Sequence, residues 1–392
     1  MHLRLASFTP IAMLFLFALM TPLLGADRKN NSGDSYLVYV GTYTGPVSKG
    51  IYAFQFDTGS DKATSLGLMT ETVNPSFLAI DPSKKFLYAV NEISNYEGKK
   101  SGSITAFAID GKSGKLAFLN RVASGGSGPC YLSLDRTGKH VLVTNYDSGS
   151  VAVFPVLSDG RLGNASATIQ HSGHGPDTTR QTGPHPHEIE VSPDSRFALV
   201  TDLGLDEVLT YHFDPAKGSL DANDPPFAKV APGSGPRHFV FDSNGKFVYV
   251  LNELNSTVGA YTYEAGGARL SLFATVSTLP ESFTGTSFGA EIAMHPNGKF
   301  LYASNHGHDS IAIFAIDESS GRPRFLETVL TGGVTPRHFE IAPGGSYLFA
   351  ENQESNNIVI FKIDQNTGHL TPTGQVLDVP APSCVKFTRL RH

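Results

Sequence analysis

The sequence predicts an all-β fold, a seven-bladed β-propeller, from three observations. Glycine and proline account for 40 and 24 of the 392 residues, more turn chemistry than a helical protein of this length would use. A short segment that opens on proline and continues as a strand recurs along the chain. Each recurrence leads through a turn into further strands in which apolar and polar residues alternate.

The recurring opening appears seven times, at intervals of 46 to 57 residues. The openings are residues 75–78, 129–132, 186–189, 236–239, 290–293, 336–339 and 382–385. In six of them an acidic or proline-led turn follows, then a second strand such as 86–90 and a third such as 104–107. A weaker fourth strand follows a glycine, as at Gly114 or Gly368. Four strands in about 50 residues is the signature of a propeller blade, whereas a stack of sandwiches gives no regular period.

The two ends of the chain predict how the ring closes. Residues 37–40, 51–56 and 66–72 read as second, third and fourth strands with no first strand before them. Residues 382–387 read as a first strand with nothing after it. We therefore expect the last blade to be closed by the N-terminal strands plus the C-terminal strand, which removes the exposed edge of an open array. Two longer insertions, 170–183 and 277–288, fall between the outer strand of one blade and the inner strand of the next.

The first residues have the features of a secretory signal peptide. Arg4 is a basic residue, residues 11–20 are largely apolar, and the small Ala26 precedes the polar Asp27. An uncleaved anchor is the alternative, but the apolar run is shorter than the roughly 20 residues that span a bilayer. We expect residues 1–26 to be a signal peptide and residues 27–392 to form one propeller domain. The protein would be exported, periplasmic or extracellular, and free of the membrane after cleavage.

Charge and cysteine content exclude several classes of function. The net charge is -6 and no basic run stands out, so nucleic acid is not an expected partner. Cys130 and Cys384 fall on inner strands of different, non-adjacent blades, and a disulfide needs Cα atoms within about 7 Å. Two buried free thiols are expected. The phosphate-loop, nucleophile-elbow and His-Glu-x-x-His motifs are all missing from the sequence.

A ring of varied side chains is expected at one mouth of the central channel. The inner strand of each blade lines the channel and the second strand runs back, so the start of one and the end of the other meet there. The first slot after each opening holds Ser76, Cys130, His187, Arg237, Glu291, Arg337 and Ser383. The next slot holds Phe77, Tyr131, Glu188, His238, Ile292, His338 and Cys384. Because buried charges are costly unless paired, the charged slots of four adjacent blades indicate a site for an anionic substrate.

Structural roles compete with functional ones at several of these positions. The asparagines that end second strands are typical turn residues. His238 and His338 could bind substrate or could be core histidines that tie neighbouring blades together. His185 and His187, with His171 and His174 in the preceding loop, could form a metal cluster, but their spacing matches no tight ligand motif. We expect no metal and no cofactor.

These residues resemble those of the seven-bladed propeller lactonase family, which groups 6-phosphogluconolactonases with carboxymuconate cyclases. The resemblance covers about residues 36–386 and is carried by stretches 39–44, 183–187, 235–238 with 252–253, and 336–339. It implies a catalytic set of a histidine, an arginine, a glutamate shortly after it, and a second arginine. The matching positions here are His187, Arg237, Glu253 and Arg337.

Lactone hydrolysis suggests a role for each member of this set. Arg237 and Arg337 would bind the substrate anion and the oxyanion, and His187 and Glu253 would transfer protons, with base and acid left unassigned. Further substrate contacts are expected from His185, His238, Glu291, His306 and His338. Two alternatives remain: a carboxymuconate cyclase that forms a lactone with the same residues, and a non-catalytic propeller that binds a sugar acid or a protein.

Overall fold

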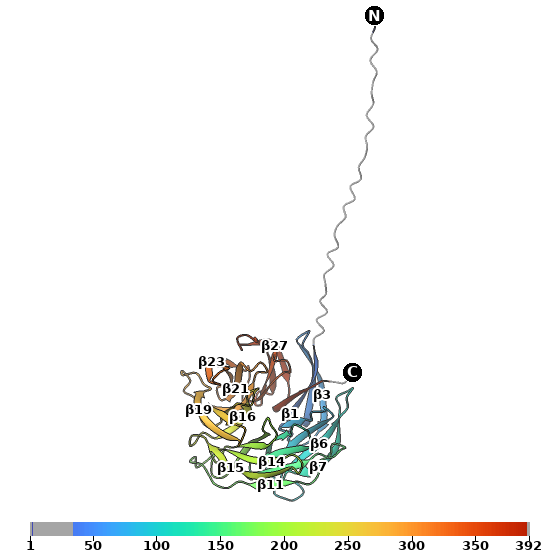
Figure 1. The fold of residues 1–392 in the computed structure, drawn as a ribbon. Helices are drawn as coiled ribbons and strands as arrows, with labels where there is room; N and C mark the ends of the chain where they lie inside the picture. Colours follow the sequence, from blue (N-terminus) through green and yellow to red (C-terminus); the bar gives the residue numbers. More distant parts are fainter. Residues whose placement is uncertain (1, 3–33, 390–392) are drawn as a thin grey trace. The chain divides into compact units, whose positions relative to one another are not determined.

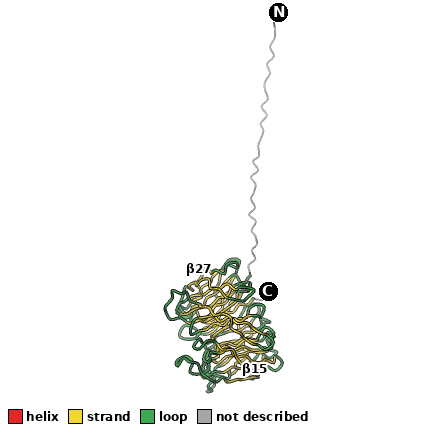
Figure 2. Tube along the Cα trace, turned by 60° about the vertical axis from the view of Figure 1, so that its left-hand side comes forward, coloured by secondary structure: helices red, strands yellow, loops and turns green. Residues whose placement is uncertain are grey.

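The computed structural model describes His2 and residues 34–389 of the protein. Regular structure in this part consists of 28 strands in seven four-stranded sheets, arranged around a ring (Figure 1). A second view shows the same strand-rich ring with loops at its edges (Figure 2). Both the all-β fold and the count of seven blades are confirmed. Apart from His2, the predicted signal peptide, residues 1–26, lies outside the described residues.

Each blade has an inner, a second, a third and an outer strand, and blades are numbered from the first complete one in the chain. The inner strands of blades 1 to 7 are β4 (Leu78–Ile80), β8 (Pro129–Leu134), β12 (Pro186–Val191), β16 (Pro236–Phe241), β20 (Phe288–Met294), β24 (Pro336–Ile341) and β28 (Pro382–Thr388). The second strands are β5 (Phe86–Asn91), β9 (His140–Asn145), β13 (Phe197–Asp202), β17 (Phe247–Asn252), β21 (Phe300–His306), β25 (Tyr347–Asn352) and β1 (Ser35–Thr42).

The outer half of each blade completes the sheet. The third strands are β6 (Ser103–Ile109), β10 (Ser150–Pro155), β14 (Glu207–Asp214), β18 (Thr257–Glu264), β22 (Ser310–Ile316), β26 (Asn357–Ile363) and β2 (Gly50–Asp57). The outer strands are β7 (Leu116–Ala123), β11 (Ala167–Gln170), β15 (Ser219–Lys229), β19 (Arg269–Ser277), β23 (Pro323–Leu330), β27 (Leu370–Asp378) and β3 (Lys62–Glu71). The loops before β12 and β20 are the two predicted insertions.

Blade 7 closes the ring as the sequence predicts. Its strand order is β28-β1-β2-β3, and β28 pairs antiparallel with β1, placing Val385 opposite Val40. Val38, Val40 and Val385 are buried in one apolar cluster with residues of blade 6. The two ends of the described chain are therefore held by both hydrogen bonds and core packing.

Buried tyrosines on second strands connect neighbouring blades. The hydroxyl of Tyr88 in blade 1 donates to the carbonyl of Gly160 in blade 2 at 3.0 Å. Tyr39, Tyr249 and Tyr302 make the same contact with Gly114, Gly321 and Gly368 at 2.6 to 2.8 Å. Gly160 has a φ of 84°, and a Cβ there would lie 2.2 Å from Cε1 of Phe86. The positive φ and the close approach of Phe86 both explain why a glycine occupies this position before the outer strand.

The asparagines that end second strands have a structural role. Asn91 Nδ2 donates to Thr72 Oγ1 at 2.8 Å, and Asn305 Oδ1 accepts from Thr278 Oγ1 at 2.5 Å, so each ties its strand to the segment that enters the blade. Blade 3 uses a different pair at this place. His171 Nδ1 lies 2.7 Å from Asp202 Oδ2, and its Nε2 lies 2.9 Å from the hydroxyl of Tyr211.

Three further expectations concern metals, cysteines and membranes. Both ring nitrogens of His171 have partners in blade 3, and no group of three or more His, Cys, Asp or Glu side chains among residues 34–389 is arranged to hold a metal ion. Cys130 and Cys384 are free and buried, as predicted. Within the same described residues, no helix has both the length and the hydropathy needed to span a membrane.

Candidate active site at the channel mouth

The inner strands present His187, Arg237 and Arg337 from the same kind of local structure. In β12 the ladder pairs Pro186 and Glu188 with consecutive residues of β13 and skips His187. The ladders of β16 and β24 skip Arg237 and Arg337 in the same way. A β-bulge of this type bends the strand and re-aims the extra side chain. The first slot of the repeat is therefore the place where a blade can turn a side chain into the channel.

Arg237 and Glu253 pair within blade 4, as the repeat suggests. Arg237 Nε lies 3.1 Å from Glu253 Oε2, and both side chains are more than nine-tenths buried. The other oxygen, Oε1, is bound by Arg180 from the loop before β12. Burial alone would raise the pKa of Glu253, but the charges of Arg237 and Arg180 outweigh it and lower that pKa. Glu253 is thus an ionised carboxylate with a guanidinium on each oxygen.

His187 is buried but keeps one ring nitrogen free. Its Nδ1 lies 3.1 Å from His238 Nε2, whereas its Nε2 has no hydrogen-bond partner within the described chain. Burial, followed by the charge of Arg237, holds the pKa of His187 well below its usual range. The imidazole is therefore neutral near pH 7, the state in which it can accept a proton.

Arg337 differs from Arg237 because it lacks an ion-pair partner among residues 34–389. Its guanidinium lies over the ring of Tyr43 at 5.3 Å from the ring centroid. The Tyr43 hydroxyl donates to Glu92 Oε2 at 2.7 Å, and Ser76 Oγ donates to the same oxygen at 2.5 Å. A guanidinium without a carboxylate on a channel wall is a ready partner for a substrate anion.

The space between these side chains is small. It is lined by Ser76, Phe77, Cys130, His187, Arg237, His238, Arg337, His338 and Ser383. Its volume is about 10 Å³, room for about one water molecule. Burial raises the pKa of the Cys130 thiol to about 12, so this residue is no thiolate nucleophile near neutral pH. The cavity suits a water molecule or one oxygen of a ligand.

Two of the other predicted site residues lie beside the predicted catalytic set. His185 stacks on Tyr146, with ring centroids 4.5 Å apart, and its Nδ1 lies 2.9 Å from the carbonyl oxygen of Tyr146. His306 is half-buried and stands at the end of β21. Burial and the charge of Arg237 lower the pKa of His306 to about 4, although Glu253 opposes this.

His238, Glu291 and His338 contact one another instead of standing apart. His238 Nδ1 lies 3.1 Å from both oxygens of Glu291, and His338 Nε2 lies 3.3 Å from Glu291 Oε2. His338 Nδ1 also lies 2.9 Å from Glu351 Oε2. These contacts join the inner strands of blades 4, 5 and 6. This is the structural role considered for His238 and His338 in the sequence analysis, that of core histidines that tie neighbouring blades together.

Sequence reasoning missed four residues of this site: Tyr43, Glu92, Tyr146 and Arg180. Glu92 follows Asn91 as Glu253 follows Asn252, so the repeat itself carried a signal for it. Tyr43 and Tyr146 occupy the same place after their second strands. Arg180 lies in an insertion outside the repeat, where no register predicts a contact.

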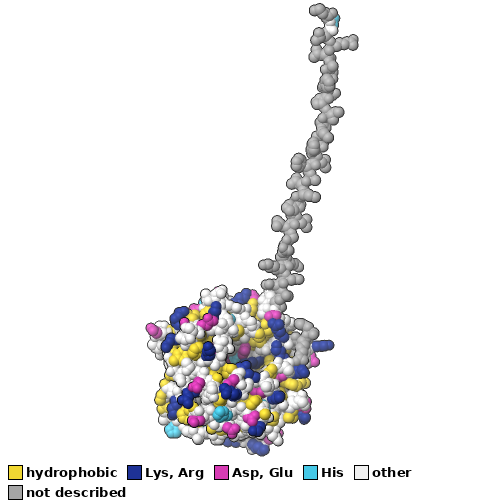
Figure 3. Space-filling model, viewed as in Figure 1, with side chains coloured by type: hydrophobic (Ala, Val, Ile, Leu, Met, Phe, Trp, Pro, Cys, Tyr) yellow, Lys and Arg dark blue, Asp and Glu magenta, His cyan; other side chains and the backbone are white. Residues whose placement is uncertain are grey.

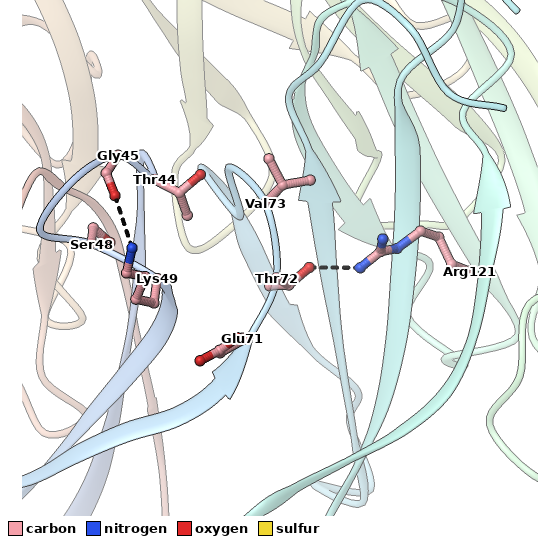
Figure 4. Close-up of a pocket in the computed structure, with 8 residues that line it drawn as sticks. All are labelled: Thr44, Gly45, Ser48, Lys49, Glu71, Thr72, Val73 and Arg121. Atoms are coloured by element: carbon pink, nitrogen blue, oxygen red, sulfur yellow. Dashed lines mark hydrogen bonds between the residues drawn. The ribbon is translucent and has the colours of Figure 1, made fainter. Parts of the chain in front are cut away.

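A second hollow, of about 520 Å³, lies at the junction of blades 7 and 1 (Figure 4). Arg121 Nη2 donates to Thr72 Oγ1 there at 2.9 Å, and Lys49 and Glu71 also line it. It contains none of the predicted site residues. One face of the propeller is hollowed near its middle, with charged side chains around the hollow (Figure 3). The candidate site is therefore placed at the channel and not at the junction.

Comparison with known proteins identifies the family of this chain. The family model "Lactonase, 7-bladed beta-propeller" matches residues 37–387. A 6-phosphogluconolactonase of Bacillus subtilis is 38% identical over 352 residues, which are 90% of this chain and 98% of that protein. One of Formosa agariphila is 36% identical, over 78% of this chain and 86% of that protein.

The solved structures include a periplasmic gluconolactonase from Pseudomonas aeruginosa. It is 33% identical, superimposes with a TM-score of 0.86, and covers 91% of this chain and all of its own. The family model spans every blade, and both curated relatives share more than 30% of their residues with the chain over most of their length. The chain belongs to the seven-bladed β-propeller lactonase family.

Proposed function

We propose that the protein hydrolyses a sugar-acid lactone that carries an anionic group. The observation that carries the proposal is the unpaired guanidinium of Arg337 on the channel wall that also presents His187 and Arg237. Relatives named 6-phosphogluconolactonase and gluconolactonase support the choice of lactone hydrolysis over other reactions on this fold.

His187 serves as the base in this proposal. Its Nε2 takes a proton from a water molecule, and the resulting hydroxide attacks the lactone carbonyl carbon. Arg237 and Arg337 stabilise the charge that develops on the carbonyl oxygen and bind the anion of the substrate. The C–O bond of the ring then breaks, and the leaving alkoxide takes the proton back from Nε2 of His187. The product is the open hydroxy acid, whose carboxyl group ionises in solution.

Glu253 has a different task from the one first expected. Both of its oxygens bind guanidinium groups, so proton transfer through them would cost two ion pairs. We assign Glu253 to hold Arg237 in place and to balance part of the local positive charge. The proton steps fall to His187 alone.

The location of the protein bears on which lactone it opens. The expected signal peptide and the periplasmic gluconolactonase relative together favour an exported enzyme acting on a lactone available outside the cytoplasm. Arg337 favours a substrate with a carboxylate or phosphate group beyond the ring. The substrate itself is found by testing lactones that differ in that group.

The test is turnover by the purified protein on a panel of lactones: 6-phosphogluconolactone, gluconolactone and an aromatic lactone. A pH-stat follows acid release, with His187→Gln and Arg237→Ala as matched low-activity variants. Saturable acid release that both variants lose by about 100-fold or more supports the proposal. Loss of the diene absorbance of a carboxymuconate without acid release would indicate a cyclase. Ligand binding with no turnover on any compound would indicate a binding propeller and overturn it.

A further inference from the structure

A chain of hydrogen bonds runs from His187 through three blades. His187 Nδ1 in blade 3 lies 3.1 Å from His238 Nε2 in blade 4, and His238 Nδ1 lies 3.1 Å from both oxygens of Glu291 in blade 5. The three side chains are each less than a tenth exposed. Each link joins two inner strands, so the chain is fixed by the packing of the ring.

The carboxylate at the Glu291 end of this hydrogen-bond chain decides which ring nitrogens of His238 and His187 carry protons. A carboxylate can only accept, so His238 Nδ1 must carry the proton that it shares with Glu291. A neutral imidazole has one N–H, which leaves His238 Nε2 as an acceptor. His187 Nδ1 must then be the donor to His238, and the lone pair of His187 falls on Nε2.

A second contact agrees with this assignment. Arg237 Nη1 lies 3.5 Å from His238 Nε2, and a guanidinium can only donate. This contact favours an unprotonated Nε2, but it is longer and weaker than the 3.1 Å contacts of His238 with Glu291. Glu291 therefore sets the tautomer of His238.

We propose that Glu291 and His238 are positioning residues that fix the tautomer of His187, so that its Nε2 is the basic atom facing the cavity. The proposal rests on the proposed function for its catalytic meaning, but the tautomer itself does not depend on any reaction. Glu291 is suited to the task because it is held on several sides. Its Oε1 accepts from the backbone N–H of Ile292 at 2.9 Å, and its Oε2 lies 3.3 Å from His338 Nε2.

The charge state of Glu291 agrees with an anchoring role. Burial would raise its pKa, but His238 and His338 together lower it to about 2. Burial lowers the pKa of His238, with Glu291 opposing, so His238 stays neutral near pH 7. The anchor is therefore an acceptor at every pH at which the enzyme would be assayed.

Nitrogen-15 NMR of histidine-labelled protein tests the tautomer directly, with His187→Gln to assign the His187 signals. We expect the wild type to carry the His187 proton on Nδ1 and an unprotonated Nε2. In Glu291→Gln the amide can donate to His238 Nδ1 as well as accept, so a mixture of His187 tautomers is expected. A His187 that carries its proton on Nε2 in the wild type would overturn the proposal.

Kinetics add a readout that a purely structural role would not move. Glu291→Gln should lower kcat by about 10-fold or more while KM changes less than about 2-fold, because substrate binding by the arginines is kept. Glu291→Asp should recover part of kcat. For the NMR measurement the matched control is His338→Gln, which removes the other histidine in contact with Glu291 but leaves His238 bound and should keep the His187 tautomer.

The outcomes separate this proposal from the proposed function. A wild type that opens no lactone overturns the function, while its NMR spectrum still decides the tautomer. An unchanged kcat in Glu291→Gln with active wild type overturns the positioning role. If Glu291→Gln does not fold, the wild-type spectrum and His338→Gln still decide the matter.

Discussion

Arg180 and Glu253 form an ion pair that joins the loop before β12 to the end of β17. The pair brings an insertion outside the blade repeat into contact with a residue of the predicted catalytic set. Arg180 also lies over the ring of Phe288, 5.7 Å from its centroid, at the start of β20. A single side chain thus connects parts of three blades at the channel mouth.

Replacing Arg180 should weaken catalysis without unfolding the protein. In Arg180→Gln, Glu253 keeps Arg237 but loses its second guanidinium, so its pKa should rise and its hold on Arg237 should loosen. Because Arg180 is about a third exposed, we expect a fall in kcat/KM of only about 3- to 10-fold. Steady-state kinetics check this, with Arg161→Gln, which breaks an exposed pair with Asp159, as the control. Equal losses in both variants would contradict the prediction.

Arg337 should determine the preference for charged lactones. Arg337→Gln removes a guanidinium on the channel wall that has no ion-pair partner among residues 34–389, so KM for 6-phosphogluconolactone should rise by about 10- to 100-fold. The effect on uncharged gluconolactone should be clearly smaller. Both values come from initial rates on the two substrates side by side. An equal loss on both would mean that Arg337 acts on the oxyanion only.

The repeat explains why so much of this fold could be predicted from sequence. Seven openings with proline locate the inner strands, and the surplus strands at the two ends require that β28 pairs with β1. The same register predicts the Arg237–Glu253 pair, since Pro236 lies directly opposite Asn252 in the ladder.

Contacts that no register fixes could not be predicted. Arg180 reaches Glu253 from an insertion, and its position depends on how that loop folds over the blade. The chain from His187 to Glu291 depends on distances between inner strands, which the repeat does not encode. The repeat places these residues at the channel but cannot distinguish a side chain that faces substrate from one that supports another side chain.

The pH dependence should report the neutral state of His187. Burial, Arg237, His238 and Arg337 all lower its pKa, so the base stays unprotonated to below its usual value of about 6.5. As pH falls, kcat/KM should therefore decline only below about pH 6.5, when Nε2 gains a proton. In Arg337→Gln one positive charge is gone, so the pKa of His187 and the acid limb should both move to higher pH.

An NMR titration of His187 in the wild type and in Arg337→Gln measures that shift. Two titratable neighbours of His187 are unchanged in the variant: Tyr146, whose ring stands edge-on 5.6 Å from the His187 ring, and His238, whose Nε2 lies 3.1 Å from His187 Nδ1. A His187 pKa that stays the same or falls would contradict the electrostatic account of this site.

Gly160 and Tyr88 should govern stability without touching the chemistry. In Gly160→Ala the new Cβ would meet Phe86 at 2.2 Å from a backbone with a φ of 84°, so the free energy of unfolding should fall by about 1 to 3 kcal/mol. Tyr88→Phe leaves the buried carbonyl of Gly160 without its donor and should cost about 1 kcal/mol. Urea titration measures both, and kcat at 25 °C should be unchanged because neither residue lines the channel cavity. The matched control is Gly183→Ala, where no heavy atom lies within 4 Å of a new Cβ. If Gly160→Ala is as stable as Gly183→Ala, the inter-blade contact is not what requires glycine there.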